Sequence, residues 1–345
     1  MTALTKPARP EQEDVRLRPV PWRRMAWVTW RQHRAALAGV AAFLGAWAVY
    51  LWLAGLQMHH AYATATTCRP ASSIACGEII AEFNVTYGDP ALTAAVLLQT
   101  APALIGAFAG APVLARELET GTFRFAWTLG FGRWRWTLAK LVPLAIMLAA
   151  GAGALSVLFS WYYRPFFADG NQTPFTPELF DLRGVAFAAW TLAAFAIGAL
   201  AGLLIRRVVP AIAATLAAYT GLALAAGLYL RQRYAAPLLT SKPNVPGSAW
   251  IMSQWWTKGG AFAFAGRPPE GLLEQLCPNP PLGPGGKPSH VTLAHCLAQH
   301  GYAQWTSYQP VSRFWPFQWI EGGWLLALSV LLIAATIWLV RRRAA

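Results

Sequence analysis

The sequence predicts an all-α polytopic membrane protein with six transmembrane helices, an in-plane N-terminal helix and a large external segment between helices five and six. Charged residues make up only 12% of the chain and hydrophobic residues 56%, whereas soluble domains are about 25% charged. The chain also has several long apolar runs. Its 18 tryptophans suit the headgroup zone of a bilayer. So few charges cannot cover a water-soluble surface.

Six apolar runs each come close to the roughly 20 residues that a helix needs to cross the hydrocarbon core. They are Ala35–Leu56, Ala91–Ala115, Leu141–Tyr163, Gly184–Ile205, Val208–Leu230 and Phe317–Val340. Only the last run contains a charged residue, Glu321, which lies at one end of it. Proline inside a helix removes a backbone hydrogen bond, so Pro102, Pro112 and Pro143 predict kinks in the second and third helices.

The N-terminal residues divide into two parts. Residues 1–21 are polar, rich in Pro and Arg, and lack the apolar core of a cleavable signal peptide, so we expect a disordered cytoplasmic tail. In residues 22–34, tryptophans and arginines partly separate onto two helical faces, which suits an amphipathic helix lying in the membrane interface. The residues concerned are Arg23, Trp27, Trp30, Arg31 and Arg34.

The distribution of Lys and Arg predicts the orientation in the cell membrane. With the N-terminus inside, the inside segments hold 18 basic residues and the longer outside segments hold 10. Both termini are then cytoplasmic. Residues 35–230 form helices one to five, 231–316 the extracytoplasmic segment, and 317–345 the sixth helix with a basic tail. The net charge of +14 is thus a topology signal that also suits anionic lipid, and nucleic acid is not needed to explain it.

The four cysteines give a second indication of sidedness. Cys68, Cys76, Cys277 and Cys296 all fall in predicted outside segments, where disulfides persist. Four cysteines allow three connectivities, and we favour the local pairs Cys68–Cys76 and Cys277–Cys296. The alternative is four free thiols placed there by chance.

The external segment has a Pro/Gly-rich centre at 278–286, which cannot form a helix or a strand. On either side, Trp250–Phe264 and Leu293–His300 are expected to form short helices at the outer membrane surface. His290, His295 and His300 lie near Cys296, but five-residue spacing scatters the rings around a helix. We therefore predict no metal site.

The most informative motif follows the second run. It reads Arg-Glu-x-Glu-x-Gly-Thr over 116–122, and a basic turn then leads to Lys140. A charged turn that ends in Gly and Thr indicates a helix stop and a short new helix after it. The alternative interpretation, without a specific function, is a solvated interfacial loop anchored by Arg and Trp.

This arrangement resembles the ABC-2 type transporter permeases, and the Trp-Arg-Gln-His-Arg sequence at 30–34 resembles actinobacterial members. The resemblance implies that loop 116–140 is a cytoplasmic coupling loop that docks on a separate ABC ATPase subunit. It gives the docking role to Arg116, Glu117, Glu119, Gly121 and Thr122. It also implies a second permease copy or a paralogue, with ATP and Mg bound only by the ATPase.

The chain itself shows no catalytic residues and no cofactor site. The nearest match to a phosphate loop, at 281–289, has Pro281 where the first Gly belongs. The runs offer nothing more polar than Gln99, Ser156, Thr191 and Thr215, so the intramembrane acids and bases of ion-coupled transporters are missing. Energy is therefore expected from a partner, and the chain is not expected to be an enzyme.

The sequence thus favours the permease subunit of an ATP-driven exporter for a hydrophobic or amphiphilic cargo, such as a drug, antibiotic, peptide or lipid. The alternative is a non-transporting membrane sensor or assembly factor whose disulfide-stabilised external segment binds a ligand. An intramembrane enzyme is a third possibility, but it would need buried acids, bases or metal ligands.

Overall fold

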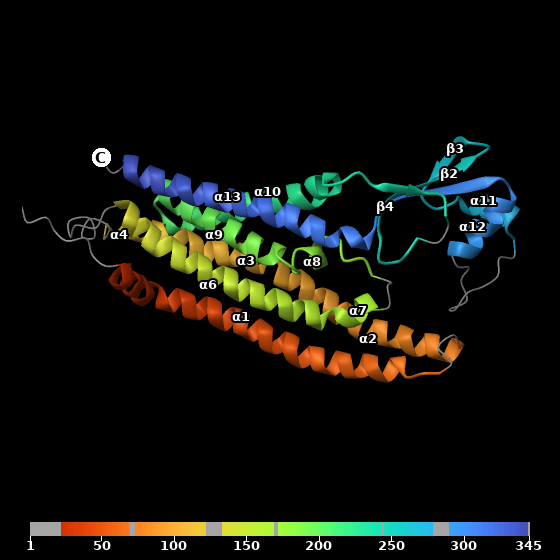
Figure 1. The fold of residues 1–345 in the computed structure, drawn as a ribbon, viewed down its shortest axis with the longest axis horizontal. Helices are drawn as coiled ribbons and strands as arrows, with labels where there is room; N and C mark the ends of the chain where they lie inside the picture. Colours follow the sequence, from red (N-terminus) through yellow and green to blue (C-terminus); the bar gives the residue numbers. More distant parts are fainter. Residues whose placement is uncertain are drawn as a thin grey trace, which may run out of the picture.

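The structure is a computed structural model that describes residues 22–69, 73–121, 133–168, 172–242, 245–278 and 290–343. The molecule is elongated: long helices run along its axis, and a small sheet lies at the end opposite the C-terminus (Figure 1). Within the described ranges, six helical segments are long and apolar enough to cross a membrane. The predicted helical membrane fold is therefore confirmed.

Five of the six spans are built on one principal helix each. They are α1 (Trp22–Thr66), α6 (Arg133–Tyr162), α9 (Ala186–Ile205), α10 (Val208–Ala225) and α13 (Phe314–Arg343). The fifth span continues beyond α10 through a π-helical turn, η2 (Ala226–Leu230), and a 3-10 turn, η3 (Arg231–Arg233). Short elements precede the fourth and sixth spans: α7 (Arg164–Ala168), α8 (Pro177–Phe180) and η4 (Val311–Arg313).

The second span is interrupted. It consists of α2 (Ile74–Gln99), α3 (Ala101–Ile105), the π-helical η1 (Gly106–Gly110) and α4 (Ala111–Thr120). The interruptions lie just before Pro102 and Pro112, each of which removes a backbone donor. Pro143, by contrast, sits inside α6, which continues through it as one helix.

The expected interfacial helix at 22–34 is helical, but no break separates it from the first span. Both belong to the 45-residue helix α1. The guanidinium of Arg31 lies over the Trp27 ring, 5.5 Å from its centroid. The candidate first span within this helix begins at Arg34, and the in-plane placement of residues 22–34 stays a prediction.

Helix α9 lies at the centre of the bundle and contacts α13, α6, α10 and the α3–α4 part of the second span. Small residues permit this close packing. A Cβ added at Gly106 would lie 2.6 Å from the backbone oxygen of Ala194, closer than real side chains come. A Cβ at Gly198 would collide with the backbone oxygen of Gly106 in the same way. The second and fourth spans thus touch backbone to backbone.

The external segment contains a four-stranded antiparallel sheet in the order β1-β4-β2-β3. Its strands are β1 (Leu238–Thr240), β2 (Trp250–Lys258), β3 (Ala261–Ala265) and β4 (Tyr302–Gln309). Two helices, α11 (Glu270–Leu276) and α12 (His290–Gln299), accompany it. The helix expected near Leu293–His300 is therefore present as α12.

The helix predicted over Trp250–Phe264 is wrong, because this segment forms the hairpin β2–β3. Gly259 and Gly260 turn the chain with φ values of 57° and 85°, the left-handed values that a tight hairpin turn requires. The Gly-Gly pair between two aromatic-rich stretches is the sequence signal for this hairpin.

Candidate functional site

The predicted docking residues lie at the last turn of α4. The helix ends at Gly121, whose φ of 71° forms a left-handed C-cap, so the predicted helix stop is confirmed. Arg116 is exposed and makes no ion pair with any described residue. Thr122 and the remainder of the loop to residue 132 lie outside the described residues.

Glu117 is paired within the chain. Its carboxylate forms an ion pair with the ammonium group of Lys140 on α6. The Lys140 side chain is only 3% exposed and its ammonium lies 4.2 Å from the centroid of the Trp136 ring. A buried lysine needs such a partner, because an uncompensated charge costs several kcal/mol. Glu117 therefore braces α4 against α6.

Glu119 caps a different helix. Its Oε2 accepts a hydrogen bond of 3.1 Å from the backbone N–H of Val208, the first residue of α10. The first N–H groups of a helix have no partner within the helix, and a carboxylate there also suits the helix dipole. Just before α10, Arg206 takes a left-handed φ of 60° as the chain turns out of α9.

These contacts make one assembly, which we call the loop joint: Glu117, Glu119, Lys140 and Val208. It ties the end of the second span to the third span through an ion pair and to the fifth through a helix cap. Of the predicted docking residues that the structure describes, Arg116 is the side chain left exposed and unpaired, whereas both glutamates are engaged.

A second group of charges lies far from the loop joint in the sequence and was not predicted. We call Asp181, Arg231 and Glu321 the charge cluster. The guanidinium of Arg231 donates to both oxygens of Glu321, at 3.0 and 2.7 Å, and to Asp181. The Arg231 side chain is 1% exposed and that of Glu321 is 0% exposed. The cluster is therefore enclosed by protein.

Other polar side chains complete this network. Glu321 accepts from Trp190 Nε1 at 2.9 Å and from the hydroxyl of Tyr234 at 3.1 Å. Asp181 accepts from Gln99 Nε2 at 3.1 Å. The network thus joins α2, α9, η3 and α13, which belong to four different spans.

One guanidinium serves two carboxylates, so the fully ionised cluster carries a net charge of −1. Burial raises the pKa of Asp181 from 3.8 to about 7. The Arg231 guanidinium opposes this rise and the Glu321 carboxylate adds to it. Burial therefore favours the protonated form of the Asp181 carboxyl in the folded protein.

Comparison with known protein families finds one whose sequence pattern this chain matches. Residues 41–231, more than half of the 345, match the family described as ABC-2 membrane transporter related. The chain belongs to this family. The resemblance inferred from the motif at 116–122 is thereby confirmed, and the match runs from within the first span to within the fifth. No curated protein and no solved structure matches the chain.

The ABC-2 family match ends at Arg231, so the external sheet and α13 lie beyond it. Glu321, which binds Arg231, is supplied by this C-terminal part. The predicted fifth run, Val208–Leu230, contains no charge, but the helical span continues to Arg233, so that Arg231 is buried within it. Its position directly after an apolar run, with an acid at the end of another run, is the available sequence signal.

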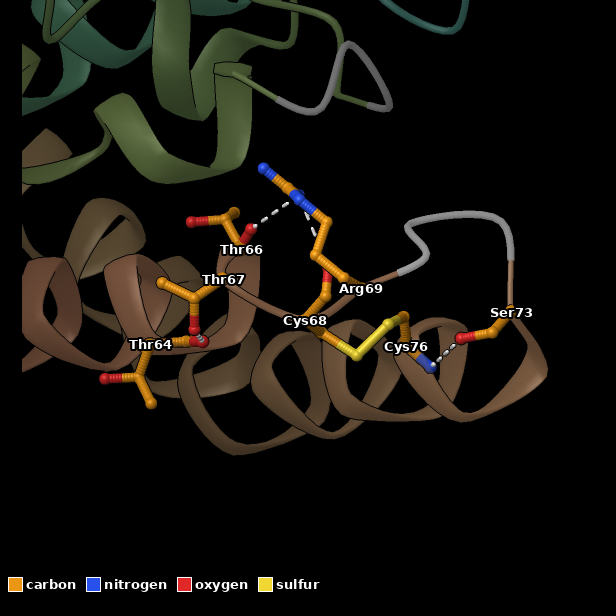
Figure 2. Close-up of a disulfide and its surroundings, with 7 residues drawn as sticks. All are labelled: Thr64, Thr66, Thr67, Cys68, Arg69, Ser73 and Cys76. Carbon is orange, nitrogen blue, oxygen red and sulfur yellow. Dashed lines mark hydrogen bonds between the residues drawn. A yellow bond between two sulfur atoms is a disulfide. The ribbon is translucent and has the colours of Figure 1, made fainter.

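Both predicted disulfides of this ABC-2 family member are confirmed. Cys68 and Cys76 link the ends of α1 and α2, with their Cα atoms 5.6 Å apart. Figure 2 shows this bond beside Ser73, whose hydroxyl accepts from the backbone N–H of Cys76 and so caps α2. Cys277 and Cys296 link α11 to α12, with Cα atoms 6.2 Å apart.

The α1–α2 turn and the α11–α12 pair lie at the same end of the molecule, away from the C-terminus (Figure 1). Near the second disulfide, His300 Nε2 lies 3.1 Å from the backbone oxygen of Leu276, and Cys296 is bonded to Cys277. Within the described residues, no group of His, Cys, Asp and Glu is arranged to hold a metal ion.

Proposed function

We propose that this chain is the permease subunit of an ATP-binding-cassette exporter, driven by a separate cytoplasmic ATPase that binds the ATP and Mg. Its cargo is hydrophobic or amphiphilic. The observation that carries the proposal is the loop joint, in a chain of the ABC-2 related family. The joint connects the loop that would receive the ATPase to three membrane spans.

The joint suits force transmission because its two contacts reach different helices. Movement of the Arg116–Gly121 turn would act on α6 through Lys140 and on α10 through Val208. The buried ion pair resists separation, since breaking it would leave an uncompensated charge. The Arg116–Gly121 turn would thus transmit movement to α6 and α10. Glu117 and Glu119 serve this connection between helices more than the docking surface.

Sidedness is consistent with this role. Basic residues mark the start of α1, the end of α4 and the end of α13, and these lie at the end of the molecule opposite the two disulfide-bonded turns (Figure 1). Basic loops stay in the cytoplasm, and disulfides persist on the oxidising face. In this orientation the loop joint faces the cytoplasm, where an ATPase can reach it, and a second permease copy or a paralogue would complete the pathway.

The test is a charge reversal at the exposed docking residue. Tagged protein purified from its native membrane should bring with it a subunit that hydrolyses ATP. Arg116→Glu should reduce this co-purified ATPase activity by about tenfold, which corresponds to about 1.4 kcal/mol of lost binding free energy, because like charges opposed at an interface repel. The readouts are vanadate-sensitive hydrolysis and identification of the partner by mass spectrometry.

Arg267→Glu is the matched control, since Arg267 is exposed in the external segment and undergoes the same change of charge. It should leave the co-purified activity unchanged. If wild-type protein brings no ATPase, the exporter proposal fails and the sensor alternative gains. If both variants lose activity equally, the docking role of Arg116 fails.

A further inference from the structure

A groove between the first two spans carries a charge that the proposed mechanism does not use. The groove has a volume of about 670 Å³, within the range of small-molecule sites. Phe43, Trp47 and Tyr50 on α1 line one side, and Asp89, Thr93 and Leu97 on α2 line the other. The spacings of three to four residues place each set on one helical face.

Asp89 is the unusual member of this lining. Its side chain is exposed, and among the described residues it makes no ion pair and no side-chain hydrogen bond. It lies on the 46-residue helical segment Ala75–Thr120 that contains the second span, two residues before the apolar run predicted there. A carboxylate in a membrane span is costly unless it has a partner, which makes it a candidate functional group.

The depth of the groove strengthens this argument. Trp47 and Tyr50 precede Leu56, the end of the first apolar run, by about 13 and 9 Å at 1.5 Å per residue. The Asp89 carboxylate therefore shares its groove with the apolar part of α1. A ligand that supplies its counter-charge would therefore have to tolerate an apolar setting.

The lining also indicates the kind of ligand. No Lys, Arg or His lines the groove, and Asp89 is its one charged residue within the described part of the chain. Trp47 and Tyr50 meet edge to face, with ring centroids 5.7 Å apart. Aromatic faces attract cations, and the apolar remainder accepts a hydrophobic body. An anion would meet only repulsion.

We propose that this groove binds a hydrophobic monocation, with Asp89 as its counter-charge and Trp47 and Tyr50 against its flanks. The proposal rests on the exporter function, because the bound cation is the cargo or an analogue of it. Cationic amphiphiles are thereby the expected cargo class. Both walls of the groove belong to membrane spans, so such a molecule reaches it from the membrane.

Binding is tested with tetraphenylphosphonium, a hydrophobic cation, against tetraphenylborate, an anion of the same shape. The purified full chain is placed in phosphatidylcholine nanodiscs and radiolabelled ligand is measured by equilibrium dialysis. Wild-type protein should bind the cation at least tenfold more tightly than the anion. Asp89→Asn should weaken cation binding by about tenfold and leave anion binding unchanged or stronger, whereas Asp89→Glu should retain cation binding.

Glu82→Gln is the matched control, because Glu82 is an exposed carboxylate on the same helix and outside the groove lining. It should leave cation binding within twofold. Equal binding of the two ligands, or full cation binding by Asp89→Asn, overturns the proposal. So does a cross-link between Trp47→Cys copies together with no cation binding by the wild-type protein, since a second chain then fills the groove. The assay needs no ATPase, so its outcome is independent of the co-purification test.

Discussion

At the scale of single residues, the charge cluster departs most from the simple picture of an apolar bundle. Arg231 is nearly fully buried, and its charge is balanced by two carboxylates and by the Phe180 ring, whose centroid lies 4.2 Å away. Buried pairs of this kind contribute little net stability compared with apolar residues, yet removing one partner is strongly destabilising. The arginine is therefore the residue on which the cluster depends.

Arg231→Met should lower the stability of the protein by about 3–5 kcal/mol, because it leaves two buried carboxylates without a cation. The measurement is thermal unfolding in detergent followed by intrinsic fluorescence. Arg233→Met is the control, since Arg233 is exposed on the same turn and lies over Tyr229. The triple variant that also carries Asp181→Asn and Glu321→Gln should recover much of the loss. Equal effects of the two arginine substitutions would contradict this account.

Asp181 gives the cluster a pH dependence. Its pKa is raised to about 7 in the folded protein and lies near 3.9 in an unfolded chain. Between these values the folded state binds more protons than the unfolded state, so stability should fall as the pH rises from about 4 to 7. Asp181→Asn should flatten this decline in melting temperature. A wild-type slope of the opposite sign in that interval, unchanged in Asp181→Asn, would refute the assignment.

At the scale of elements, the contact between the second and fourth spans depends on glycine. Gly198→Ala should destabilise the protein by about 1–3 kcal/mol, the range for overpacking, because the new methyl group meets the backbone of Gly106 and Ala111. Gly153→Ala is the control. Its added Cβ meets nothing within 4 Å, and alanine favours a helix by about 1 kcal/mol over glycine. Thermal unfolding should therefore show a lower melting temperature than wild type for Gly198→Ala and a higher one for Gly153→Ala.

The membrane elements are predictable from the sequence because length and hydropathy determine a span almost independently of its neighbours. The strands and helices of the external segment are less predictable from the sequence. Trp250–Phe264 is apolar and aromatic, and a short run of that kind fits a strand or a helix equally well by composition. Only its pairing with Tyr302–Gln309, far along the chain, distinguishes the two.

The candidate site is predictable in part for a similar reason. The Arg116–Gly121 motif and its helix stop are local, and local chemistry is readable from the sequence. The partners of its glutamates are not local: Lys140 lies 23 residues from Glu117 and Val208 lies 89 residues from Glu119. The motif therefore suggests an external partner for both glutamates, although the chain engages them itself. The charge cluster escapes prediction because its members lie far apart along the chain: Asp181 is 50 residues and Glu321 is 90 residues from Arg231.

At the scale of the whole molecule, two separate sequence signals agree on sidedness. The bias of basic residues and the placement of cysteines both divide the segments between two faces. The fold brings both disulfide-bonded turns to one end. The agreement arises because both signals reflect the two environments that a membrane separates.

The fifth span is fixed at both of its ends. Glu119 holds its first residue, Val208, while Glu321 and Asp181 hold Arg231 directly after its last π-helical turn. An α-helix is stiff along its axis, with a set rise of about 1.5 Å per residue, so this rod cannot absorb a displacement by changing length. If the proposed ATPase pushes on the loop end, we expect the displacement to appear as tilt or rotation at the far end of the span. In the exporter that we propose, the fifth span would thereby link the two faces of the membrane, and ATP hydrolysis at the cytoplasmic face would reach the external face through a helix held at both ends.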